Sequence, residues 1–174
     1  MAEAIKKNDT TIVKALIKNG MAPEQLDSTG RPLFHLAARL GHTDIMKLMI
    51  AMGANINSQD DIGFTALMEA SRNKKRKAVQ VLLDAGADVN IQTLPSSLNF
   101  SVLHLAAIAG DQEIISLLNK HHANLNAQDN DGNTPAIWAI YEGDKATAKY
   151  MIHLGANGDL ENKFGISANK LLKG

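Results

Sequence analysis

The sequence has no cysteine, few aromatic residues and no excess of either charge. Its 174 residues hold one tryptophan, two tyrosines and four phenylalanines, and 18 basic side chains balance 18 acidic ones. Without cysteine the chain has no disulfide, no thiolate metal site and no thiol nucleophile. The balanced charge argues against a protein that binds nucleic acids or membrane surfaces, because both classes of protein need a basic excess.

Long apolar runs are also absent. No stretch approaches the roughly 18 apolar residues of a membrane helix, and residues 1–8 contain no apolar run of signal-peptide length. The 45% of hydrophobic residues is nevertheless typical of a folded chain. We therefore expect a soluble protein that does not contact membranes and lies in the cytoplasm. A nuclear location and secretion as an effector stay open.

Four sequence markers recur with one period. They are a loop glycine, a pair of small residues, a glycine that follows an apolar stripe, and an asparagine. The loop marker falls at Gly30, Gly63, Asn99, Gly132 and Gly165, and the fourth marker at Asn57, Asn90, Asn126 and Asp159. Successive copies are 33 residues apart, apart from one step of 36 residues. Four markers that agree on one period and one insertion indicate a repeat protein.

Each copy is predicted to contain two helices joined by a turn. Apolar residues at helical spacing, such as Leu82 and Leu83, predict a longer helix with one buried stripe. The pairs of small residues lie in a shorter helix before it. The glycine after each stripe predicts a helix end in the left-handed conformation. Three hydroxyl side chains are predicted to cap the short helices: Thr65, Ser101 and Thr134.

These units resemble the ankyrin repeat. The family's Thr-Pro-Leu-His-x-Ala-Ala pattern appears in part at 103–107, 35–38 and 134–135, and its Gly-Ala-Asp-Val-Asn ending appears at 53–57 and 86–90. The resemblance implies an all-α solenoid of stacked helix-turn-helix units with β-turn or hairpin loops. It implies one domain over 1–174. The expected parts are a degenerate capping repeat at 1–26, full repeats at 27–59, 60–92, 93–128 and 129–161, and a partial cap at 162–174.

The histidines do not form a catalytic or metal site in the sequence. The resemblance assigns His35 and His104 a hydrogen bond within the cap of a short helix. His121 and His122 are neighbours near a helix end, and adjacent residues do not share a helix face, so they are a poor chelating pair.

Other chemical motifs fail as well. The turn at 129–132 resembles part of a calcium loop, but Ala127 and Trp138 stand where acidic ligands are needed. The chain contains no P-loop, no G-x-G-x-x-G and no G-x-S-x-G motif. We predict that the protein is not an enzyme and has no catalytic residues, no metal and no cofactor.

The resemblance implies a scaffold that binds another protein through a concave face of turn tips and short helices. Carried over position by position, it gives eight partner-binding candidates: Leu40, Ile62, Phe64, Arg72, Leu98, Phe100, Ile108 and Tyr141. Ser28 and Thr29 are further turn-tip positions. The three extra residues of the 36-residue step fall within 93–98, so this loop is expected to project on the same face.

The aromatic residues are expected in two places. Three should lie in the core: Phe34, Trp138 and Tyr150. The other four should be exposed on the binding face: Phe64, Phe100, Tyr141 and Phe164. Exposed aromatic residues on a scaffold mark a protein-binding surface. The alternative is that Phe64 and Phe100 fold back onto neighbouring turns.

Two further hypotheses remain. The basic run at 72–77 is either a solvated turn between two helices or a site for an anion, nucleic acid or acidic protein. It also fits a nuclear-import signal. The resemblance further implies Asn90 as a modification site for an asparaginyl hydroxylase, because Leu82, Asp88 and Val89 match the preference of such enzymes. The alternative is that Asn90 caps its own turn. We expect a monomer, and a bacterial effector or regulatory ankyrin protein stays open.

Overall fold

The computed structural model describes residues 1–22, 25–28 and 30–174. This part of the chain holds eleven α-helices, one 3-10 turn and, beyond two isolated bridges, no strand, which confirms the all-α fold. The chain divides into two compact units, Met1–Asp88 and Val89–Gly174, called here the first and second units. Each is described by itself, and the organisation as one domain stays a prediction.

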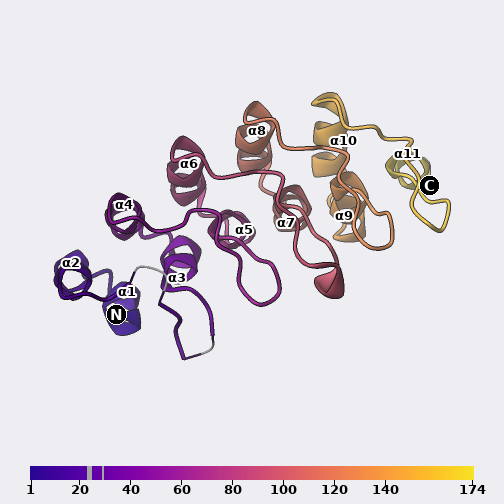
Figure 1. The fold of residues 1–174 in the computed structure, drawn as a ribbon. Coiled ribbons are helices and arrows are strands. Elements are labelled where there is room, and N and C mark those ends of the chain that lie inside the picture. The colour runs from indigo at the N-terminus through magenta and orange to yellow at the C-terminus, as the bar shows by residue number, and fades with distance from the viewer. Residues whose placement is uncertain (23–24, 29) are drawn as a thin grey trace. The chain divides into compact units, whose positions relative to one another are not determined.

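The first unit consists of three helix pairs. The pairs are α1 (Ala2–Lys6) with α2 (Thr10–Lys18), α3 (Leu33–Leu40) with α4 (Thr43–Ala51), and α5 (Ala66–Arg72) with α6 (Arg76–Asp84). Helices α1, α3 and α5 pack side by side in one layer, and α2, α4 and α6 form the other (Figure 1). The hairpin-like loops hang from the ends of the short helices.

The second unit repeats this arrangement. Its pairs are α7 (Val102–Ala109) with α8 (Gln112–Lys120) and α9 (Pro135–Tyr141) with α10 (Lys145–His153), followed by α11 (Ala168–Lys173). Helix α9 packs against both α7 and α11, and α8 against α10. The 3-10 turn η1 (Pro95–Ser97) lies in the loop before α7. The three extra residues of the long step therefore lie in a loop, as predicted.

The predicted helix caps are present. The side-chain oxygens of Thr65, Ser101 and Thr134 accept hydrogen bonds from the third residue of their helices. Helices α1 and α3 lack such a cap, because Met1 and Pro32 occupy their cap positions and neither side chain has a hydroxyl. A cap side chain satisfies one of the backbone N–H groups that a helix start leaves without a partner.

The long helices differ in their caps. Asp9, Asp111 and Asp144 accept from backbone N–H groups of α2, α8 and α10. His42 and Lys75 occupy the same position before α4 and α6 and make no such bond. Two long helices of the first unit thus begin without a side-chain cap, whereas both long helices of the second unit have one.

The long helices end as the sequence predicts. Gly86 has a φ of 86° and His122 has a φ of 64°, so the histidine adopts the left-handed conformation that glycine supplies elsewhere. Small residues fill the helix interfaces, where Ala37, Ala38, Ala106 and Ala107 are fully buried. These small side chains let neighbouring helices approach closely. No helix in the described ranges is long and apolar enough to cross a membrane.

Candidate functional site

The structure divides the eight predicted partner-binding residues into three groups. Ile62, Leu98 and Tyr141 are exposed by 39%, 53% and 47%, and Arg72 is also exposed. Leu40 and Ile108 are half-buried. Thr29, a predicted turn-tip position, lies outside the described residues. Whether any of these side chains touches a partner stays a prediction.

The expected exposure of Phe64 and Phe100 is wrong. Each side chain is only 7% exposed. The ring of Phe64 lies 5.1 Å from the Arg72 guanidinium carbon. Phe100 stacks on His104 at a centroid distance of 5.2 Å, with the two rings nearly parallel. A phenylalanine ring offers a large apolar area, so folding back against these neighbours is more favourable than remaining in water. These two residues support the surface from beneath.

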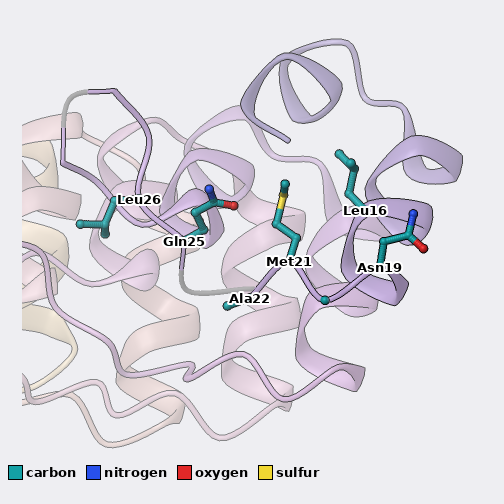
Figure 2. A pocket seen from close by; sticks show the side chains of 7 residues that line it. Leu16, Asn19, Met21, Ala22, Gln25 and Leu26 are labelled. Atoms are coloured by element: carbon teal, nitrogen blue, oxygen red, sulfur yellow. The ribbon is translucent and has the colours of Figure 1, made fainter.

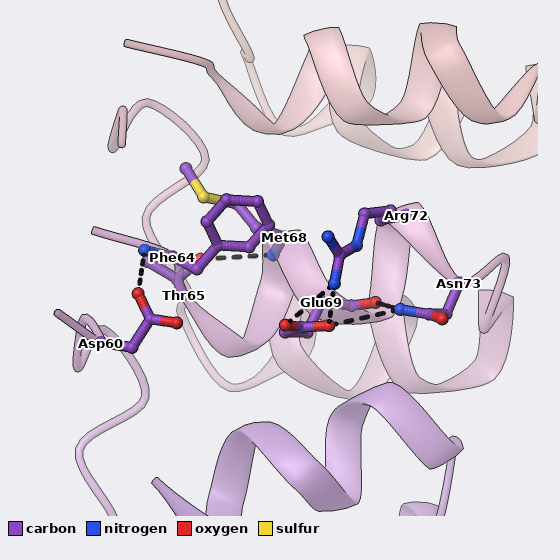
Figure 3. A network of polar contacts seen from close by, with 7 residues as sticks. All are labelled: Asp60, Phe64, Thr65, Met68, Glu69, Arg72 and Asn73. Atoms are coloured by element: carbon purple, nitrogen blue, oxygen red, sulfur yellow. Dashed lines mark hydrogen bonds and ion pairs between the residues drawn. The ribbon is translucent and has the colours of Figure 1, made fainter. Parts of the chain in front are cut away.

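In the first unit, a buried carboxylate organises the surface around α5. Glu69 has only 3% of its surface exposed, and its carboxylate accepts hydrogen bonds from Arg72 Nη2 at 3.1 and 3.2 Å. Asn73 Nδ2 donates to the Glu69 backbone oxygen at 2.8 Å and to its carboxylate at 3.3 Å. Figure 3 shows this network beside the Phe64 ring. The arrangement fixes the Arg72 guanidinium over an aromatic ring, which adds a cation–π attraction.

In the second unit, the equivalent surface is aromatic. Trp138 meets Phe100 edge-on at 5.2 Å and Tyr141 edge-on at 5.9 Å. The Trp138 indole N–H donates to the Asp129 carboxylate at 2.7 Å, which satisfies its one polar atom. The cluster runs from buried Phe100 to exposed Tyr141. It presents an ordered aromatic edge to solvent.

The loop tips of the second unit are joined by backbone hydrogen bonds. Asn130 N–H donates to the Leu98 carbonyl at 3.0 Å, and Lys163 N–H donates to the Asp131 carbonyl at 2.9 Å. The three loops therefore lie next to one another. They carry Leu98 at one end and Phe164, which is 69% exposed, at the other.

The other aromatic predictions have mixed outcomes. Phe34 is buried, as predicted, and Phe164 and Tyr141 are exposed, as predicted. Trp138 and Tyr150 are half-buried rather than fully enclosed.

The two histidines of the short helices are structural, and only one completes its cap. His104 Nδ1 accepts from Ser101 N–H at 3.0 Å, and its Nε2 bonds to the Asn133 carbonyl at 3.0 Å. His35 Nε2 bonds to the Ser58 carbonyl at 2.9 Å, but its buried Nδ1 has no partner among the described residues. Pro32 explains this, because it stands where Ser101 stands and has no N–H to donate. Burial lowers the pKa of both His35 and His104, so both rings are neutral at pH 7.

The basic run spans the turn between α5 and α6 and the helix residues on either side of it. Arg72 ends α5, Lys74 adopts a positive φ of 55°, and Lys75 precedes α6. The Lys75 side chain packs over Gly41, where an added Cβ would lie 3.1 Å from Lys75 Cδ. Binding of an anion by this run stays a prediction.

Asn90 takes part in a repeated contact between neighbouring loops. Its Oδ1 accepts from Asn124 N–H at 3.0 Å. Asn57 accepts from Asp88 N–H and Asn126 accepts from Asn157 N–H in the same way, at 2.9 and 2.7 Å. These bonds link one copy to the next rather than closing the residue's own turn. Modification of Asn90 stays a prediction.

One hollow of the first unit has no titratable side chain in its lining. It has a volume of about 610 Å³ and lies between the end of α2 and the segment that leads to α3 (Figure 2). Its lining includes Leu16, Met21 and Leu26, with the amides of Asn19 and Gln25 and no titratable side chain. No group of three potential metal ligands occurs among the described residues.

Glu69 is the residue that sequence reasoning missed. It occupies the position that Leu36, Leu105 and Trp138 hold in the other copies. The sequence contains a signal for this role. Glu69 is a carboxylate at an apolar repeat position, and Arg72 follows three residues later on the same helix face.

Comparisons with known proteins agree with the repeat assignment. The family model for ankyrin repeats (3 copies) matches residues 1–93 and 94–162. The chain is 32% identical to dog inversin over 130 residues, which cover 75% of the chain and 12% of that protein. It is 32% identical to mouse neurogenic locus notch homolog protein 1 over 143 residues, covering 79% of the chain and 5% of the relative.

One relative carries an enzyme name. The chain is 28% identical to a Dirofilaria immitis L-asparaginase over 154 residues, which are 88% of the chain but 26% of that protein. The chain thus spans about a quarter or less of the length of these curated relatives, and their names describe whole proteins. The ankyrin repeat is typically a non-catalytic module that binds other proteins. Since the family model covers nearly the whole chain, the chain belongs to the ankyrin repeat family.

Proposed function

We propose that this chain is a non-catalytic adaptor that binds a partner protein through its short helices and loop tips. In the second unit the contact surface is Tyr141 with its support Trp138, flanked by Leu98 and Phe164. In the first unit it is Ile62, Arg72 and the exposed parts of Leu40. The protein acts as a monomer in the cytoplasm.

The aromatic edge of the second unit carries the proposal. Tyr141 is held by Trp138, and Trp138 is held in turn by Asp129 and Phe100. An exposed aromatic residue with an ordered support loses little conformational entropy on binding. Tyrosine and tryptophan are also the residues that contribute most at protein interfaces. The fold itself does not require a large exposed ring at this position, because Ile108 and Arg72 occupy it in other copies.

Affinity capture with crosslinking mass spectrometry tests the proposal. The bait is the full chain, in its native form and as Leu98→Ala with Tyr141→Ala. The matched control is Tyr150→Ala, which removes a half-buried tyrosine from α10 instead of α9. We expect the double variant to lose a captured protein that the native chain and the control retain. Unchanged capture by the folded double variant would refute the surface.

A further inference from the structure

The arginines of the chain gather in the first unit. The sequence has 14 lysines but only four arginines, and all four lie before residue 77: Arg31, Arg39, Arg72 and Arg76. Arginine differs from lysine in presenting a planar fork that grips a carboxylate with two parallel hydrogen bonds. A set of arginines on one face therefore indicates an anionic ligand more specifically than a general basic patch.

Two of these arginines occupy equivalent places. Arg39 lies in the last turn of α3, and Arg72 ends α5, one 33-residue copy later. Helices α3 and α5 pack side by side. The axes of packed helices lie about 8–10 Å apart, so the backbone positions of Arg39 and Arg72 are spaced by roughly this distance.

The side chains of Arg39 and Arg72 differ in their contacts and exposure. Arg72 is fixed by Glu69 and by the Phe64 ring, and 44% of its side chain is still exposed. Arg39 is partly buried, and its side chain makes no hydrogen bond or ion pair with any residue that the structure describes. The carboxylates of Asp27 and Glu69 line a small hollow beside Arg39, and its guanidinium group can still donate hydrogen bonds to an arriving anion.

A hollow beside Arg39 extends the cationic surface. It has a volume of about 290 Å³ and is lined by three cations, Lys6, Arg31 and Arg39, with one carboxylate, that of Asp27. That carboxylate already accepts a hydrogen bond from the Arg31 backbone N–H at 3.2 Å. The lining therefore favours negatively charged groups.

We infer that the first unit recognises an acidic segment of the partner protein, with carboxylates gripped by Arg39 and Arg72. An extended peptide advances about 3.3 Å per residue, so two carboxylates three residues apart span about 10 Å and match the spacing of the two arginine positions. The preferred segment therefore has the form acid-x-x-acid. A nucleic acid fits less well, because the chain as a whole carries no net positive charge. This inference depends on the proposed function and specifies the partner's chemistry.

Selection from a phage library of random twelve-residue peptides tests the inference. The target is the full chain, and each selected peptide is synthesised and titrated by fluorescence polarisation. We expect enrichment of Asp and Glu in pairs three residues apart. Arg39→Gln should weaken these peptides about tenfold, as should Arg72→Gln, because each substitution removes one charge-assisted bidentate contact. The double variant of Lys14→Gln and Lys47→Gln removes two exposed charges of the same unit and should change affinity less than threefold.

Arg39→Gln is the decisive variant, because Arg39 has no described partner whose loss would disturb folding. Circular dichroism checks that Arg72→Gln, which removes the partner of Glu69, still folds. Peptides without acidic pairs, or acidic peptides that bind Arg39→Gln as tightly as the native chain, would overturn the inference. Tighter binding of a single-stranded oligonucleotide than of every selected peptide would do the same. If non-acidic peptides bind and depend on Tyr141, the adaptor function stands while this inference fails. If no peptide is selected, this inference fails, while the adaptor function is decided by the affinity-capture experiment.

Discussion

In the last turn of their short helices, the first unit carries Arg39 and Arg72, while the second carries Ile108 and Tyr141. One turn earlier, Glu69 stands where Leu105 and Trp138 stand. The scaffold at these positions is the same, with small buried residues beside them in every copy. The helix pair therefore leaves these positions free to vary, and the chain uses them for charge in one unit and aromatic area in the other.

The largest loss of stability is expected when a buried carboxylate like that of Glu69 is introduced into the second unit. Leu105→Glu places a carboxylate at a buried position without an arginine three residues later. The free energy of unfolding of the second unit should fall by about 3–5 kcal/mol, because a buried charge without a partner is strongly unfavourable. Urea denaturation followed by Trp138 fluorescence measures the loss.

The reverse exchange is the control. Glu69→Leu leaves Arg72 in contact with water, so the free energy of unfolding should change by less than about 1 kcal/mol. Equal losses in the two variants would show that the first unit depends on the Glu69 carboxylate as strongly as the second unit excludes one, so this position would not be free to vary.

Helix caps give a smaller contrast between the units. Asp111→Ala removes the cap of α8 and should cost about 1–2 kcal/mol of stability, whereas His42→Asp supplies a missing cap to α4 and should add about 1 kcal/mol. For a chain of this length, 1 kcal/mol corresponds to roughly 2–4 °C in the unfolding midpoint, which calorimetry resolves. If His42→Asp lowers the midpoint, His42 stabilises α4 by a contact other than a cap.

Much of this fold could be predicted from the sequence. The glycine markers, with Asn99 and His122 in two of their places, fix where the backbone turns left-handed, and Thr65, Ser101 and Thr134 fix where helices begin. These features are local, so a repeat period is enough to find them.

The burial of Phe64 and Phe100 could not be predicted from the repeat period and local sequence pattern. Each ring precedes a helix cap, at a position that Arg31, Asn133 and Ile166 hold elsewhere, so the register alone does not fix its burial. What buries each ring is the side chain that happens to face it, Arg72 in one unit and His104 with Trp138 in the other. Such contacts depend on tertiary neighbours rather than on local pattern.

The smallest expected effect is the change of stability with pH that the two buried histidines cause near neutral pH. Burial lowers the folded pKa of His35 and His104 below the unfolded value of about 6.5. Above about pH 7.5 neither state holds the proton, so stability is unaffected. As the pH falls through about 6.5, the unfolded chain binds protons that the folded chain excludes, and stability decreases.

Urea midpoints between pH 7.5 and 5.5 measure this dependence. His104→Gln should reduce the slope of stability against pH in this window, even though it lowers stability at every pH through the lost Ser101 contact. A slope identical to that of the native chain would mean that His104 titrates equally in the folded and unfolded states.

Hydrogen–deuterium exchange of the full chain, with and without the captured partner, tests the adaptor surface most directly. The account predicts new protection in the loop tips and short helices, including 95–99, 130–141 and 66–73, and unchanged exchange in α4, α6, α8 and α10. Protection confined to those four long helices would contradict it.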